Sequence, residues 1–128
     1  MSTPFSTMRA ARRTFVLAAI SAAAMGFGGV QAADYPSKPI KLIVPFTAGS
    51  GTDIIARVIS AGLQDSLKTS VVVENLPGAS GQIAASAAAK AKPDGYTIFF
   101  TTNTTQAANV SLFKSLPYDP IKDFAPIT

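Results

Sequence analysis

The loop PFTAGSGTD, from Pro45 to Asp53, combines neutral hydrogen-bond donors with a single ionisable side chain. Thr47, Ser50 and Thr52 supply hydroxyl groups, and only Asp53 could act as a base. The whole chain has no cysteine and no histidine. It therefore lacks disulfides, thiolate nucleophiles and the commonest general base and metal ligand. These residue types favour the binding of a small molecule over hydrolysis or metal chemistry.

The glycines of this loop indicate how it could hold a ligand. A helix that begins near Thr52 exposes unpaired N–H groups and a partial positive charge at its first turn. Gly49 and Gly51 have no side chains, so a ligand could approach the backbone closely. Such a site suits a carboxylate or a phosphate that is held by hydrogen bonds alone. The alternative is that Ser50 or Thr52 only caps the helix and the glycines only permit the turn.

The surrounding sequence predicts an alternation of strands and helices. Short apolar runs predict three strands, at Ile40–Val44, Ser70–Glu74 and Tyr96–Thr102. Two helices are predicted between them, at Asp53–Leu67 and Gly81–Lys92. The apolar residues with helical spacing in the first are Ile54, Ile55, Val58, Ile59, Leu63 and Leu67. Beyond the third strand, we expect a short helix at Gln106–Phe113 and the beginning of a fourth strand at Asp123–Thr128.

Strands separated by helices predict an α/β fold, with right-handed crossovers and an open parallel sheet of βαβαβ order. In such a sheet, the loops that leave the carboxyl ends of the strands meet at one edge, and ligands bind in the crevice there. Three loops fit this description, Thr47–Asp53, Asn75–Gly81 and Thr102–Gln106. All three are rich in Gly, Ser, Thr or Asn, as expected for a polar binding site.

A dinucleotide-binding enzyme is the main catalytic alternative, with Gly49, Gly51 and Glu74 as its site. GSGTDI begins like the fingerprint G-x-G-x-x-G, and Glu74 ends the second predicted strand, where a partner for the ribose would lie. However, Ile54 replaces the third glycine, and Asp53 would place negative charge beside the pyrophosphate. The match to the fingerprint is therefore weak.

Two other enzyme motifs are missing from the sequence. A Walker A loop requires a Gly-Lys-Ser/Thr ending, and no lysine occurs between Lys41 and Lys68. The nucleophile elbow G-x-S-x-G is not found around Ser50 or Ser80, and no histidine exists to activate either serine. We therefore expect no catalytic residue, no cofactor and no metal site.

Residues 1–32 are typical of an export signal peptide. Arg9, Arg12 and Arg13 form a positively charged segment. Thr14–Val30 follow as an apolar run, and Ala32 ends a cleavage-like Val-Gln-Ala sequence. We expect cleavage after Ala32 and a periplasmic protein, exported by the general secretory route in preference to the twin-arginine route. The alternative is a retained membrane anchor, which the short, Ala- and Gly-rich run disfavours.

Composition and charge limit the remaining classes of protein. The chain has 128 residues, 48% hydrophobic and 14% charged, which is enough for at most one small domain. Its formal charge of +4 comes mostly from the arginines of the signal, because residues 33–128 carry a net charge of only +1. Without a basic stripe in that part, nucleic-acid binding is not indicated.

Three segments, taken in order, resemble a known family. They are ADYPSKPIKLIVPFTAGSGTD, VVVENLPGASGQIAASAAAKAKPDGYT and SLFKSLPYDPIKDFAPIT. In combination they resemble the N-terminal part of the Bug family, the extracytoplasmic substrate-binding proteins of tripartite tricarboxylate transporters. The resemblance extends from Tyr35 to Thr128.

This resemblance implies a two-lobed binding protein that closes on a small carboxylate and delivers it to the membrane subunits of the transporter. The ligand would be a di- or tricarboxylate, or a related organic or amino acid, held by backbone and hydroxyl groups and partly through ordered water. Asp53 would order the loop, or meet the ammonium group of an amino acid. The implied ligand-binding residues are Phe46, Ala48, Gly49, Ser50, Gly51, Thr52, Asp53, Gly81, Thr102 and Asn103.

Two residues depart from the family pattern, and so does the length. Ser50 stands where a second consecutive glycine is common, and Leu76 stands where a basic residue is common. Members of the family fold as two domains, and residues 33–128 suffice for only part of one. We therefore expect an incomplete N-terminal α/β lobe that leaves sheet edges and apolar helix faces uncovered. A truncated piece without function is the alternative.

Overall fold

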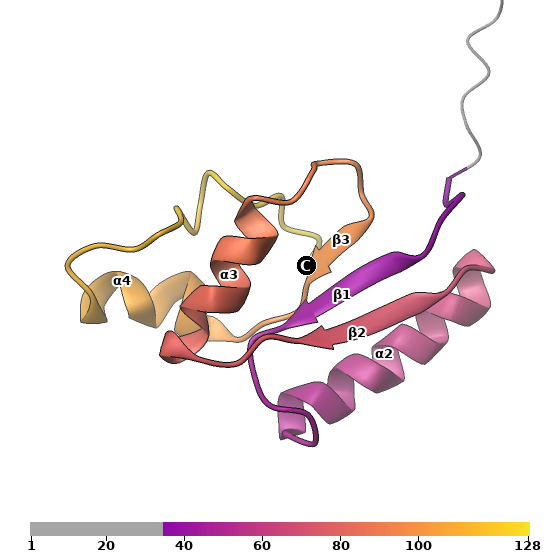
Figure 1. Ribbon diagram of the computed structural model, residues 1–128, viewed down its shortest axis with the longest axis horizontal. Coiled ribbons are helices and arrows are strands. Elements are labelled where there is room, and N and C mark those ends of the chain that lie inside the picture. Colours follow the sequence, from indigo (N-terminus) through magenta and orange to yellow (C-terminus); the bar gives the residue numbers. More distant parts are fainter. Residues whose placement is uncertain (1–34) are drawn as a thin grey trace, which may run out of the picture. The chain divides into compact units, whose positions relative to one another are not determined.

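The computed structural model describes residues 35–128, so the predicted export signal lies outside the described residues. The predicted alternation of strands and helices is confirmed (Figure 1). The elements in chain order are β1 (Ile40–Val44), α2 (Gly51–Leu67), β2 (Val71–Asn75), the 3-10 turn η2 (Ala79–Gly81), α3 (Gln82–Ala89), β3 (Thr97–Phe99), the π-helical turn η3 (Thr104–Ala108) and α4 (Asn109–Leu112). Among these helices, none is both long enough and apolar enough to cross a membrane.

The predicted parallel sheet is also confirmed, with β1 at its centre in the order β2-β1-β3. Ile40 of β1 pairs with Val71 of β2, and Leu42 of β1 pairs with Ile98 of β3. The chain thus moves to one side of β1 to form β2, and then to the other side to form β3. Right-handed crossovers in opposite directions put α2 and α3 on opposite faces of the sheet, as Figure 1 shows.

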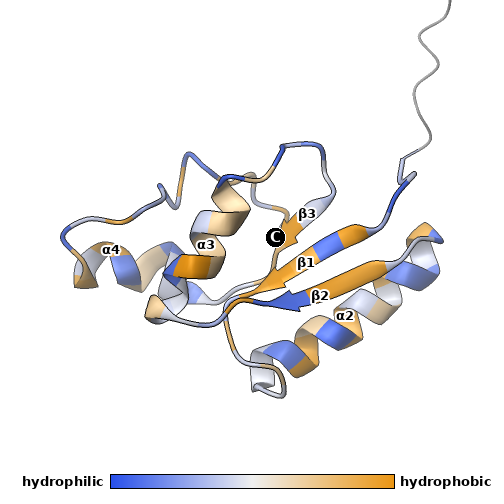
Figure 2. Cartoon of the chain, in the orientation of Figure 1, coloured by the Kyte–Doolittle hydropathy of each residue, from blue (hydrophilic) through white to orange (hydrophobic). Residues whose placement is uncertain are grey.

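Alternate residues of β1 form the hydrophobic core beneath α2. Ile40, Leu42 and Val44 are at most 1% exposed, and they pack with Ala56 of α2 and Val71 of β2. Burying an aliphatic side chain of this size stabilises a fold by roughly 1.5–3 kcal/mol relative to leaving it exposed. Most of β1 and β2 is coloured as apolar in Figure 2.

Well-defined caps set the ends of α2. The Ser50 Oγ accepts a hydrogen bond from the N–H of Asp53 at 3.2 Å, which makes Ser50 the N-cap. Lys68 ends the helix in a left-handed conformation, with φ of 53°, and its N–H donates to the Gln64 carbonyl. Because of the Ser50 cap, the helix begins at Gly51 and not at the predicted Asp53.

The face of α2 that meets the sheet is formed by small or polar residues. Asp53, Ala56 and Ser60 are its buried residues, and Ser60 Oγ donates a hydrogen bond of 2.8 Å to the Val71 carbonyl. Most of the large apolar side chains lie on the outer side, where the exposed ones are Ile54, Ile55, Val58 and Ile59. Orange bands along α2 in Figure 2 mark apolar residues of this helix. Within residues 35–128, the expected uncovered apolar helix face is therefore confirmed.

The opposite face of the sheet is covered by α3 and by the C-terminal segment. Ala84 and Ala85 of α3 are fully buried, and Ile43 of β1 is 3% exposed. The ring of Phe124 stacks on that of Phe99 in β3, with centroids 5.7 Å apart. Small alanine side chains allow α3 to lie close to the sheet, and Phe124 covers the edge strand beyond it.

The structure corrects the predicted C-terminal part of the sheet. β3 spans Thr97–Phe99 and not Tyr96–Thr102, since it pairs only with the middle of β1. The predicted strand at Asp123–Thr128 is wrong, because these residues are irregular and pair with no strand of the described part. A turn precedes them, in which the N–H of Asp119 donates to Asp123 Oδ2 at 2.7 Å. The second helix is also shorter than predicted.

Candidate functional site

The loops that follow β1, β2 and β3 meet at one edge of the sheet, as predicted. Because all three strands are parallel, their carboxyl ends point the same way (Figure 1). The second loop is bonded to the helix that follows the third loop, since Asn109 Nδ2 at the start of α4 donates to the Ser80 carbonyl at 3.0 Å. Gly81 lies so close to Thr105 and Pro45 that a side chain at this position would touch both. The three loops therefore form one continuous surface.

This edge includes the point at which the strand order reverses. β2 and β3 flank β1 on opposite sides, so the loops after β1 and β3 diverge toward opposite faces of the sheet. In open α/β sheets, the crevice between such diverging loops is the usual ligand site. The position of β1 thus selects the loops at 45–50 and 100–104 as the most suitable part of the surface.

The loop between β1 and α2 presents an accessible helix start. The N–H groups of Gly51 and Thr52 lie in the first turn of α2 and have no acceptor within the helix. Gly49 has a φ of +82°, which favours glycine. A side-chain carbon at Gly49 or Gly51 would meet no other atom within 4 Å. The backbone here is therefore open to a ligand.

Asp53 is buried behind this helix start and is fully engaged by the protein. Its side chain is 2% exposed. Oδ2 accepts hydrogen bonds from Arg57 Nε at 3.0 Å and from the N–H of Gly49 at 2.8 Å. Oδ1 accepts a hydrogen bond from Asn75 Nδ2 at 2.9 Å. This geometry supports the expectation that Asp53 orders the loop, and it gives no support to a direct contact with a ligand ammonium group.

These hydrogen bonds lower the pKa of the Asp53 carboxyl group. The Arg57 side chain first, then the Gly49 N–H and Asn75, lower the pKa of the Asp53 carboxyl from 3.8 to about 2. A pKa that is lower in the folded state than in the unfolded state means that the ionised group stabilises the fold. That stabilisation is complete above pH 4 and is lost as the pH falls through about 2.

We therefore expect the free energy of unfolding of the chain to fall between pH 4 and pH 2 more steeply than that of Asp53→Asn. The substitution removes the titrating group but leaves Asp94 and Asp119, whose pKa values are also lowered by hydrogen bonds. Urea unfolding at several pH values in this range would measure the difference. Parallel pH profiles would show that Asp53 is not held as an ionised group.

Four consecutive residues of the second loop have positive φ angles. They are Gly78 at 124°, Ala79 at 47°, Ser80 at 54° and Gly81 at 80°. The two residues that are not glycine adopt a conformation that costs on the order of 1–3 kcal/mol each, and such strain clusters at ligand-binding segments. The hydrogen bond from Asn109 to the Ser80 carbonyl helps to hold this conformation.

A buried polar cluster supports the third loop. Thr105 and Asn109 are fully buried, and Tyr118 is 6% exposed. The Tyr118 hydroxyl donates to the Thr105 carbonyl at 2.6 Å and accepts from Asn109 Nδ2 at 3.3 Å, while the Thr105 and Thr101 hydroxyls lie 2.7 Å apart. The predicted short helix is found here as η3 followed by α4. Its π-helical turn is of a kind frequent at functional sites.

Most of the ten predicted ligand-binding residues lie on the surface of this edge. Only Asp53 and Gly81 are buried, while the others are exposed or half-buried. Sequence reasoning did not select the residues that support the site, which are Asn75, Thr105, Asn109 and Tyr118. A signal existed for two of them, because Asn75 opens the loop NLPGASG and Tyr118 lies in the motif LPYDP.

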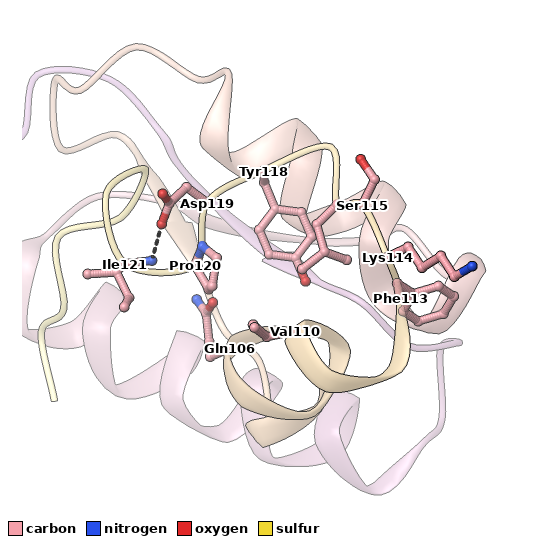
Figure 3. A pocket seen from close by; sticks show the side chains of 10 residues that line it. Gln106, Val110, Phe113, Lys114, Ser115, Tyr118, Asp119, Pro120 and Ile121 are labelled. Atoms are coloured by element: carbon pink, nitrogen blue, oxygen red, sulfur yellow. Dashed lines mark hydrogen bonds between the residues drawn. The ribbon is translucent and has the colours of Figure 1, made fainter.

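A hollow of about 410 Å³ lies elsewhere, between α4 and residues 113–121 (Figure 3). Val110, Phe113 and Ile121 give it apolar walls. Asp119 Oδ1 accepts a hydrogen bond from the N–H of Ile121 at 2.9 Å, which shapes the turn on one side. None of the ten predicted ligand-binding residues lines this hollow.

Within residues 35–128, no group of three or more acidic residues could hold a metal ion.

Comparison with known proteins places these features in a family. The model of the Tripartite tricarboxylate transporter family receptor matches residues 55–128. A UPF0065 protein of Bordetella bronchiseptica is 42% identical over 115 residues, which are 90% of this chain and 34% of the relative. Protein BugT of Bordetella pertussis is 44% identical over 100 residues, which are 77% of this chain and 31% of the relative. The chain thus spans about a third of the length of these relatives.

Solved structures agree with the sequence relatives. A periplasmic transporter is 54% identical, with a TM-score of 0.71 over 73% of this chain and 32% of its own. MatC from Rhodopseudomonas palustris with bound malate is 40% identical, with a TM-score of 0.70 over 73% and 32% of the two chains. A second R. palustris protein, with adipate, is 42% identical, with a TM-score of 0.66 over 68% and 29%. From the family match and the shared fold, the chain belongs to the Bug family of tripartite tricarboxylate transporter receptors.

Proposed function

We propose that residues 35–128 form the first part of the ligand-binding lobe of a periplasmic receptor for a small dicarboxylate. The receptor would be exported with cleavage after Ala32 and would deliver its ligand to the membrane subunits of a tripartite tricarboxylate transporter. It would bind the ligand without catalysis. Residues that correspond to the other two thirds of its relatives would complete this lobe and form the second lobe.

The observation that carries this proposal is the accessible first turn of α2 beside the carboxyl end of β1. The N–H groups of Gly51 and Thr52 offer hydrogen bonds and the positive end of the helix dipole to a carboxylate. The open space over Gly49 and Gly51 supports close approach to the backbone. Arg57 is the basic residue closest in sequence to this turn, and its guanidinium is engaged by Asp53 and Asn75. Recognition by neutral donors is therefore favoured.

The ligands of the relatives support the choice of substrate class. Two related structures are described with malate and with adipate. Both molecules are dicarboxylates, and one carries a hydroxyl group while the other has a longer apolar chain. A first carboxylate held by backbone groups of the β1 loop would be common to both. Residues outside 35–128 would then bind the second carboxylate, and they would select ligands by the distance between the two carboxylates.

Binding measurements test this proposal directly. We would replace the matching segment of the malate-binding relative with residues 35–128 of this chain, and titrate the chimera with malate, adipate and NAD by calorimetry. We expect it to bind at least one of the two dicarboxylates and not to bind NAD. The unmodified relative serves as the positive control for malate, and circular dichroism verifies that the chimera is folded.

Two results would contradict the proposal. A folded chimera that binds NAD, and neither dicarboxylate, would favour the dinucleotide site at Gly49, Gly51 and Glu74. A folded chimera that binds none of the three molecules would show that this segment does not contribute a dicarboxylate site, as expected of a piece without function.

A further inference from the structure

The side chain of Asn75 connects the loop after β2 to the loop after β1. Its Nδ2 donates one hydrogen bond to the Phe46 carbonyl at 3.0 Å and another to Asp53 Oδ1 at 2.9 Å. Its Oδ1 accepts a hydrogen bond from an Arg57 terminal nitrogen at 3.3 Å. One half-buried side chain at the end of β2 thus reaches the start of the β1 loop, the carboxylate of α2 and a guanidinium.

The chemistry of these partners requires an amide at position 75. The Phe46 carbonyl and Asp53 Oδ1 are both acceptors, so the group that faces them must supply two hydrogens. A carboxylate would supply none and would repel Asp53, and an apolar side chain would leave both acceptors without a donor. This donor pattern also fixes the orientation of the Asn75 amide.

The connection continues through Asp53 to the backbone of the ligand loop. Asp53 Oδ2 accepts the N–H of Gly49 at 2.8 Å, and Gly49 directly precedes the N-cap Ser50. Asn75 therefore fixes Oδ1 of the Asp53 carboxylate, and Oδ2 of the same carboxylate holds the Gly49 N–H. The side chain of Asp53 is only 2% exposed, so it can act on a ligand only through this loop.

We propose that Asn75 is a positioning residue, which acts through Asp53 to hold the backbone at Gly49 and the first turn of α2 in the conformation that receives the ligand. This inference deepens the proposed function and rests on it. Asn75 itself does not contact the ligand in this role. It reduces the number of loop conformations before binding, so that less conformational entropy is lost when the carboxylate binds.

Amide hydrogen exchange in the full chain, followed by NMR without any ligand, tests the positioning role. In Asn75→Ala, we expect the Gly49 N–H to exchange at least tenfold faster than in the unmodified chain. The amides of Leu42 and Val44 in β1 should keep their rates, because the sheet retains its pairing. Val72→Ala is the matched control, since Val72 is exposed on the same strand and makes none of these hydrogen bonds.

A double variant tests the pattern of donors and acceptors. Asn75→Asp alone places two carboxylates together and should accelerate Gly49 exchange further than Asn75→Ala. Adding Asp53→Asn places an amide N–H group opposite the new carboxylate at position 75. The amide oxygen at position 53 can still accept the Gly49 N–H. We therefore expect the Gly49 N–H to exchange more slowly in the double variant than in Asn75→Asp. If the two substitutions only destabilised the fold, the double variant would exchange at least as fast.

Several outcomes would overturn this inference. Unchanged Gly49 exchange in Asn75→Ala would do so, and so would an equal acceleration of Gly49 and the β1 amides, which would indicate only a loss of global stability. The exchange experiment needs no ligand, so it is independent of the proposed function. In the chimera, Asn75→Ala should in addition weaken dicarboxylate binding at least fivefold. If the unmodified chimera bound no dicarboxylate while the exchange results held, the proposed function would fail and the positioning of the loop would stand.

Discussion

Replacement of Gly81 by alanine is expected to destabilise the chain by about 2–4 kcal/mol, because it combines backbone strain with overpacking. Gly81 has a φ of +80°, and an added Cβ would lie 2.6 Å from Thr105 Cγ2 and 3.1 Å from Pro45 Cβ. Neither neighbour can move easily, since Pro45 is rigid and Thr105 is fully buried and hydrogen-bonded to Thr101. Urea unfolding of the full chain would measure the loss.

Gly62→Ala is the matched control for this substitution. Gly62 lies in the middle of α2, and an added Cβ would meet no atom within 4 Å. Alanine is favoured over glycine inside a helix, so this variant should be more stable by about 0.5–1 kcal/mol. A stable Gly81→Ala variant would mean that the three loops do not approach one another as described.

Gly51→Val is expected to weaken dicarboxylate binding by the chimera at least tenfold, which corresponds to about 1.4 kcal/mol. The side chain would project from the first turn of α2, where the N–H groups would meet a carboxylate. Within residues 35–128 its Cβ would meet no other atom within 4 Å, so we expect the fold to survive. Calorimetric titration would measure the affinity, and circular dichroism would verify the helix.

Ala61→Val provides the comparison, because it adds the same two methyl groups at an exposed position farther along α2. Its affinity should equal that of the unmodified chimera. Equal affinities for the two variants would mean that the loop PFTAGSGTD is only a turn, capped by Ser50, and that the ligand is held elsewhere.

The sheet and its loops could be predicted from sequence because they depend on local patterns. The apolar run at Ile40–Val44 is continuous, and the glycines and hydroxyl residues after it stand at a helix start. The end of the sheet could not be predicted in this way. Thr97–Phe99 is short because it pairs only with Lys41–Ile43 in the middle of β1, and pairing is a property of two segments.

The orientation of α2 was also beyond the sequence pattern. Helical spacing predicted the helix, but spacing does not state which face meets the sheet. Hydrogen bonds with distant residues fix that face, since Ser60 bonds to Val71 and Asp53 bonds to Asn75. The supporting residue Asn75 was not selected for the same reason, since its partners are distant in sequence. Only the pairing of β1 with β2 brings them to it.

The central position of β1 determines the order in which the sheet can form as the chain emerges, amino terminus first, on the far side of the membrane. Ile40 pairs with Val71, while Lys41, its neighbour, pairs with Thr97. A chain that is translocated amino terminus first can therefore form half of the sheet once β2 has emerged. The other side of β1 keeps its hydrogen-bonding groups free until β3 follows. Contacts of this sequence separation slow folding. β1, the first strand in the chain, therefore gains its second neighbour only after β3 has formed.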